Sequence, residues 1–105
     1  MKIENTFGDT IRKLREEKQK PLREVAEALN IDTSMLGKIE KNSRKPTKQL
    51  IEKIAKFFNV NDKDLMVAFL SDTIAYKVMD EEDFAIEVLK VAEKKVKYLK
   101  NKRTS

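Results

Sequence analysis

Small polar and cationic side chains recur on one face of a helix that the sequence predicts over residues 33–41. At about 100° per residue, that face consists of Thr33, Ser34, Gly37, Lys38 and Lys41. The opposite face consists of Met35, Leu36, Ile39 and Glu40. Hydroxyl and ammonium groups can hydrogen-bond to base edges in the DNA major groove, which admits an α-helix. The pattern therefore predicts a helix that packs through one side and contacts DNA through the other.

A second short helix and a tight corner precede this segment. Its apolar residues follow the i, i+3, i+4, i+7 spacing of a buried helical face: Leu22, Val25, Ala26 and Leu29. Asn30 suits the left-handed conformation in which many helices end. Asp32 or Thr33 can accept a hydrogen bond as the N-cap of the following helix. A helix, a three-residue turn and a second helix form a helix-turn-helix arrangement.

The excess positive charge lies in the same half of the chain. Residues 1–60 contain 14 Lys and Arg against 9 Asp and Glu, whereas residues 61–105 contain 9 of each. The cations of segment 38–48, which face the single acid Glu40, are Lys38, Lys41, Arg44, Lys45 and Lys48. A basic stretch alone is often only a solvated surface. Beside a polar helix face, it favours contacts with DNA phosphates.

These residues resemble the lambda-repressor-like (Xre-type) DNA-binding domain over residues 6–70. The resemblance rests on the run Ile11-Arg12-Lys13-Leu14-Arg15, on Val25-Ala26 with the turn at 30–32, and on the stretch IEKNSRKPT. That last stretch is also similar to restriction–modification controllers, and the size resembles that of small phage-type regulators. The resemblance implies an all-α fold with a five-helix DNA-binding domain over 1–70. A C-terminal extension over 71–105 would add one amphipathic helix.

The resemblance also implies roles for individual residues. Thr33, Ser34 and Lys38 correspond to positions that meet base edges, and Arg15 corresponds to an arginine that pairs with the glutamate at Glu40. The residues expected to contact phosphates are Lys41, Asn42, Ser43, Arg44, Lys45, Thr47 and Lys48, together with backbone N–H groups at the start of the helix that follows.

Two positions depart from the family pattern. The family usually has Ser or Thr followed by Gln where this chain has Pro21-Leu22, so we expect the neighbouring Arg23 to supply the phosphate contact. Gly37 is unusual inside a recognition helix, where glycine costs about 1 kcal/mol relative to alanine. Gly37 is either a tolerated surface position or a point of close approach to the bases, and we group it with the expected base contacts.

The remaining elements also read as helices. We expect a first helix over 6–18, a fourth that starts at Pro46-Thr47 and ends near Asn59, and a fifth that starts at 61–64. The side chains expected in the core are Phe7, Ile11, Leu14, Val25, Ala26, Leu29, Ile31, Leu36, Ile39, Leu50, Ile54, Phe58, Val60 and Leu65.

The end of the chain predicts a helix near 81–100. Acids lie at its start and cations at its end, as the helix dipole favours. Its apolar residues recur at 4, 3, 4, 3 spacing, as in a coiled-coil seam: Ala85, Leu89, Ala92, Val96 and Leu99. Such a short seam must pack on the domain or on a second subunit; a helix lying on a membrane surface is the alternative. We expect a homodimer, with Leu89, Ala92, Val96 and Leu99 in its interface.

The amino-acid composition excludes several kinds of chemical site. The chain has no cysteine and no histidine, so disulfides and thiolate or imidazole metal sites are impossible. We expect no metal, no cofactor and no membrane span, and a cytoplasmic location by default. The sequence has no glycine-rich phosphate loop and no sign of a carboxylate pair in an apolar pocket. We therefore expect that the protein is not an enzyme.

Two function classes compete after the enzyme is set aside. The first is a sequence-specific transcriptional regulator, a homodimer that reads a near-palindromic operator in double-stranded DNA with the helix at 33–41. The alternative is an antitoxin or protein-interaction module whose C-terminal helix binds a partner protein. The operator sequence cannot be predicted from these residues, because hydroxyl and lysine side chains can contact several bases.

Overall fold

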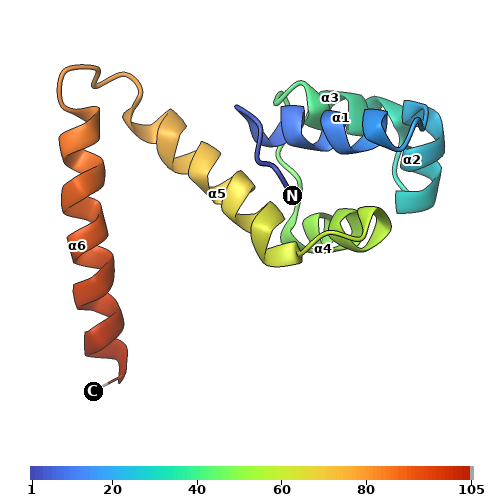
Figure 1. Cartoon of the computed structure of the whole chain (residues 1–105). Helices are drawn as coiled ribbons and strands as arrows, with labels where there is room; N and C mark the ends of the chain where they lie inside the picture. Colours follow the sequence, from blue (N-terminus) through green and yellow to red (C-terminus); the bar gives the residue numbers. More distant parts are fainter. Residues whose placement is uncertain (105) are drawn as a thin grey trace. The chain divides into compact units, whose positions relative to one another are not determined.

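The computed structural model describes residues 1–104, and over this range the chain folds into α-helices with no strand (Figure 1). The helices are α1 (Phe7–Glu17), α2 (Leu22–Leu29), α3 (Thr33–Glu40), α4 (Lys48–Phe58), α5 (Asp62–Val78) and α6 (Ala85–Thr104). The expected all-α class, with five helices and an extra C-terminal helix, is confirmed.

Most helix ends follow local capping chemistry. The Thr6 hydroxyl accepts a hydrogen bond from the Asp9 N–H, and the Thr47 hydroxyl accepts one from the Leu50 N–H, so each residue caps the helix that follows it. Asn30 and Asn59 end their helices in the left-handed conformation, at φ 58° and 54°. Asp32 occupies the N-cap position of α3, but its side chain makes no capping hydrogen bond, so that part of the expectation is wrong.

The last helix begins later than expected. Residues 80–84 form turns in which the Glu81 N–H donates to the Val78 carbonyl and the Phe84 N–H donates to the Glu81 carbonyl. The expected start near residue 81 is therefore wrong, and α6 begins at Ala85. Of the acids in this region, Glu87 lies in the first turn of α6, while the four acids of 80–83 precede the helix.

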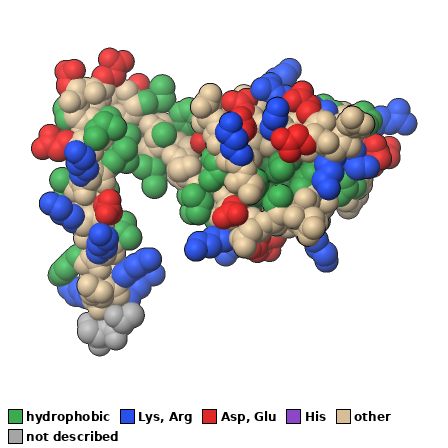
Figure 2. All heavy atoms as spheres, in the orientation of Figure 1, with side chains coloured by type: hydrophobic (Ala, Val, Ile, Leu, Met, Phe, Trp, Pro, Cys, Tyr) green, Lys and Arg blue, Asp and Glu red, His purple; other side chains and the backbone are tan. Residues whose placement is uncertain are grey.

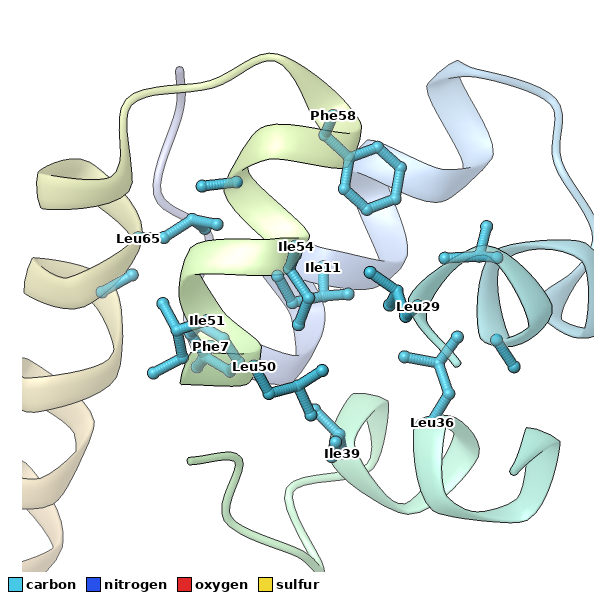
Figure 3. Close-up of a cluster of buried hydrophobic side chains, with 14 residues drawn as sticks. Phe7, Ile11, Leu29, Leu36, Ile39, Leu50, Ile51, Ile54, Phe58 and Leu65 are labelled. Atoms are coloured by element: carbon cyan, nitrogen blue, oxygen red, sulfur yellow. The ribbon is translucent and has the colours of Figure 1, made fainter. Parts of the chain in front are cut away.

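The chain divides into two compact units, and the core belongs to the first, Met1–Asp72. Side chains from α1 to α5 converge in this core (Figure 3). Two buried members, Ala55 and Ala68, were not expected, whereas Leu14, Ile31 and Val60 are only partly buried against the cluster. Phe7 meets Phe69 edge-on, with ring centroids 5.6 Å apart, so α1 and α5 share an aromatic contact.

The second unit starts at Thr73 and contains the last turns of α5 and all of α6. Its apolar side chains are largely exposed, including Val96 at 52% and Leu99 at 56%. Within residues 1–104, no helix is both long enough and apolar enough to cross a membrane.

Candidate nucleic-acid interface

The helix α3 separates its side chains as its sequence predicts. Leu36 and Ile39 are 0% and 1% exposed and point into the core (Figure 3). Thr33, Ser34 and Lys38 are exposed. The aliphatic side therefore anchors the helix, and the hydroxyl and ammonium groups of the other side are available to an external ligand.

The turn between α2 and α3 fixes how these helices meet. Ala26 is fully buried, and its small side chain lets α2 lie close to its neighbours. The left-handed Asn30 directs the chain back, so that the Ile31 N–H donates to the Ala26 carbonyl at 3.0 Å. The end of α4 has the same hydrogen bond, which the Val60 N–H donates to the Ala55 carbonyl at 2.9 Å.

Gly37 lies on the side of α3 that faces the start of α2. A Cβ built on Gly37 would lie 3.5 Å from Leu22 Cδ2, an ordinary van der Waals contact. The helix α3 therefore has room for a methyl group at this position within the fold. Packing in this unit alone does not require glycine at 37.

An ion pair joins α1 to the end of α3. Arg15 Nε and Nη2 donate to the two carboxylate oxygens of Glu40, at 2.7 and 3.0 Å. Arg15 Nη1 also donates to the Lys20 carbonyl. The two side chains are 17% and 7% exposed. Hydrogen bonding to Glu40 raises the pKa of Arg15 above its ordinary value, against the lowering effect of burial, so the guanidinium stays charged.

The loop after α3 is held by the start of α1. Asn42 adopts a left-handed conformation, with φ 63°. Its side-chain oxygen accepts a hydrogen bond from the Gly8 N–H, and its side-chain nitrogen donates to the Thr6 hydroxyl, both at 2.9 Å. The Asn42 side chain therefore ties two elements together inside the domain; a phosphate contact by this residue stays a prediction.

Gly8 makes this contact sterically feasible. A Cβ at Gly8 would overlap the Glu40 carbonyl group and lie 2.7 Å from the Asn42 side-chain oxygen. Asp72 caps the same helix end, because its carboxylate accepts a hydrogen bond from the Phe7 N–H at 2.7 Å. The first three N–H groups of α1 are thus bonded to the side chains of Asp72, Asn42 and Thr6.

Sequence reasoning missed the roles of Gly8 and Asp72. Both depend on residues far away in the chain, 34 positions for Gly8 with Asn42 and 65 for Phe7 with Asp72. A glycine in the first turn of a predicted helix was the available signal, since glycine weakens a helix unless close packing requires it.

The loop between α3 and α4 presents its cations outward. Lys41, Arg44, Lys45 and Lys48 are exposed, while Pro46 is buried and anchors the loop. Among the described residues, no acidic side chain lies within ion-pairing distance of these four cations or of Lys38. The hydroxyl of Ser43 donates to the Lys38 carbonyl, which closes the end of α3.

The start of α4 adds polar groups next to these cations. Thr47 accepts a hydrogen bond from the Leu50 N–H, and its own hydroxyl proton remains available to an acceptor. A helix N-terminus beside unpaired cations can hold a phosphate. Arg23 lies in the first turn of α2 and is highly exposed, with only a 3.6 Å contact to Glu27.

The expected dimer residues lie on α6 in the second unit. Leu89 and Ala92 are partly exposed, and Val96 and Leu99 are exposed. The residues described contain no group of three or more Asp or Glu side chains placed to hold a metal ion.

The chain also matches a known family. A family model described as "Helix-turn-helix" (HTH_3) covers residues 11–65, which include α2, the turn and α3. Comparison with curated proteins and with solved structures found no match.

Proposed function

This chain belongs to the Xre/lambda-repressor-like helix-turn-helix family of DNA-binding domains, and we propose that it is a sequence-specific transcriptional regulator. Members of this family are typically non-enzymatic. The observation that carries the proposal is the division of α3 into a buried aliphatic side and an exposed hydroxyl and ammonium side.

In this proposal, α3 enters the major groove. Thr33, Ser34 and Lys38 contact base edges, and Gly37 lets the backbone approach them closely. The Arg15–Glu40 pair fixes the angle between α1 and α3. This pair supports base recognition, because a recognition helix must be held rigidly to discriminate bases.

The basic loop and its neighbours position the phosphates. The proposed phosphate contacts are Arg23, Lys41, Asn42, Ser43, Arg44, Lys45, Thr47 and Lys48. Lys41, Arg44, Lys45 and Lys48 are exposed and, among the described residues, form no ion pair, and Arg23 is exposed beside Glu27. Exposed cations support this role, because phosphate binding gains free energy from the release of counterions. Phosphate contacts set the register of the protein on DNA and carry no sequence information directly.

We further propose that the protein acts as a homodimer through its C-terminal extension, residues 71–105, with Leu89, Ala92, Val96 and Leu99 in the interface. Two recognition helices would then meet half-sites about 34 Å apart in a near-palindromic operator. The exposed apolar side chains of α6 support this role, since they lose contact with water only when another surface covers them. The same exposure favours a second candidate, an antitoxin whose α6 binds a partner protein.

The test is binding to genomic DNA fragments, starting with the region upstream of the protein's own reading frame, at several salt concentrations. We expect one or a few fragments to bind selectively, with log K falling steeply against log salt. Binding without selectivity would overturn sequence-specific regulation. A salt slope near zero would overturn phosphate neutralisation by the basic loop.

A further inference from the structure

Charge is divided along the C-terminal segment. Residues 80–87 contain five acids and no cation, and residues 94–103 contain six cations and no acid. Figure 2 shows the acidic side chains gathered around the turn before α6 and the basic ones along the rest of the helix. Lys90 and Glu93 lie between these ends, and Glu93 pairs with Lys97 at 3.1 Å. The segment therefore has an acidic start and a basic finish.

The apolar seam of α6 alternates in size. Its five positions, in chain order, are Ala85, Leu89, Ala92, Val96 and Leu99. A parallel pair in register would place each residue against its own copy, so Ala85 and Ala92 would form two underfilled layers. An antiparallel pair with the helices fully overlapped places Ala92 against the partner's Val96 and Leu89 against the partner's Leu99. The second arrangement sets the small Ala92 against the larger Val96, while Ala85 lies beyond the partner's seam.

We propose that two copies of this chain pair through α6 in antiparallel orientation, a proposal that rests on the homodimer proposed above. The acidic segment 80–87, which precedes and begins each α6, then lies toward the basic finish of the other helix. A parallel pair would bring five acids beside five acids and six cations beside six cations. With helix axes about 8–10 Å apart, comparable to the Debye length of about 8 Å at physiological salt, the sign of these contacts still affects association.

Helix dipoles act in the same direction. Antiparallel neighbours place the positive end of one dipole beside the negative end of the other. The exposed apolar side chains of α6 also include Val88 and Val91, at 38% and 44%, which widen the seam that the second copy would cover. Charge, side-chain size and dipole thus favour one orientation of one partner.

Single cysteines distinguish the two orientations, because the natural chain contains none. The variants Ala92→Cys and Leu99→Cys are treated with a short bis-maleimide at a concentration at which the chain is dimeric. An antiparallel pair places the two copies of residue 99 about 14 Å or more apart along the axis, and the two copies of residue 92 within about 8 Å. We expect Ala92→Cys to cross-link at least tenfold faster than Leu99→Cys. Equal cross-linking of both variants would indicate a parallel pair and overturn the proposal.

Salt gives a second, independent readout on the unmodified chain. Opposite charges across the pair predict that the dimer dissociation constant rises several-fold between low and high salt in sedimentation equilibrium. A parallel pair predicts the reverse, because salt would screen repulsion. A dissociation constant that falls with salt would therefore contradict the antiparallel pair.

DNA binding is measured on the same two variants before cross-linking, so that the two proposals can fail separately. A parallel dimer that selects one DNA fragment would overturn the orientation and leave the regulator intact. A chain that stays monomeric at all concentrations tested would overturn the pairing itself. An antiparallel dimer with no selective DNA binding would support the pairing and overturn the regulator.

Discussion

The two units of this chain differ in where their apolar side chains are covered. In the first unit, α3 buries Leu36 and Ile39 completely against helices from the same chain. In the second unit, α6 has an equally regular apolar seam, but Val96 and Leu99 are more than half exposed. Helical periodicity therefore identifies the side of a helix that will be covered, and does not identify what covers it.

The largest expected effect separates these two helices directly. Leu36→Ala removes a fully buried side chain from α3 and should lower the free energy of unfolding by about 3–4 kcal/mol. Leu99→Ala in dilute, monomeric protein should change it by less than about 0.5 kcal/mol, since Leu99 is 56% exposed. Urea denaturation followed by circular dichroism measures both. Similar losses in the two variants would show that α6 is covered within the monomer and that the two units do not differ in this respect.

The two glycines of the first unit differ in the space around them. Gly8→Ala forces a Cβ against the Glu40 carbonyl and the Asn42 side chain, and should cost about 2–3 kcal/mol. Gly37→Ala is the matched control, because its Cβ has room beside Leu22; it should gain about 1 kcal/mol from helix propensity. Thermal melts of the two variants should therefore shift in opposite directions. A stabilised Gly8→Ala would contradict the close approach of α1 to the end of α3.

The sequence predicted the first unit better than the second because its signals are local. The spacing of Leu36 and Ile39 identified the buried side of α3, and Asn30 and Asn59 marked two helix ends in chemistry that spans a few residues. The start of α6 was predicted too early, because acidic residues such as those of 80–83 occur both in the first turn of a helix and in the turn before it. The hydrogen bonds of Asp72 and Gly8 were not predicted, because the tertiary fold brings their partners close from distant positions in the chain.

The Arg15–Glu40 pair came from resemblance to a family, and spacing alone could not have indicated it. The two residues lie 25 positions apart, and the structure brings them into a two-point hydrogen-bonded pair. Burial of Ala55 and Ala68 was also missed, since a helix packed on two sides has a wider apolar face than a single stripe of residues predicts.

Glu40→Gln tests the link between α1 and α3. The amide keeps the volume but removes the charge that pairs with Arg15, and the free energy of unfolding should fall by about 2 kcal/mol. Glu24→Gln is the control, because its pair with Lys20 is exposed and should contribute less than about 0.5 kcal/mol. Chemical denaturation compares them; an unchanged midpoint for Glu40→Gln would remove the stabilising role of the pair.

In the proposed complex, the polar side of α3 contacts bases and the loop after α3 binds phosphates. The most direct measurement compares Lys38→Ala with Lys45→Ala on the selected DNA fragment and on a panel of its single-base variants. We expect Lys38→Ala to lose about 1–3 kcal/mol of binding free energy and to stop discriminating at one base position. Lys45→Ala should weaken binding to all sequences alike and reduce the salt slope by about one. If Lys38→Ala also weakens binding to every sequence equally and leaves base preferences unchanged, Lys38 does not contact bases, and base recognition by the polar side of α3 is contradicted.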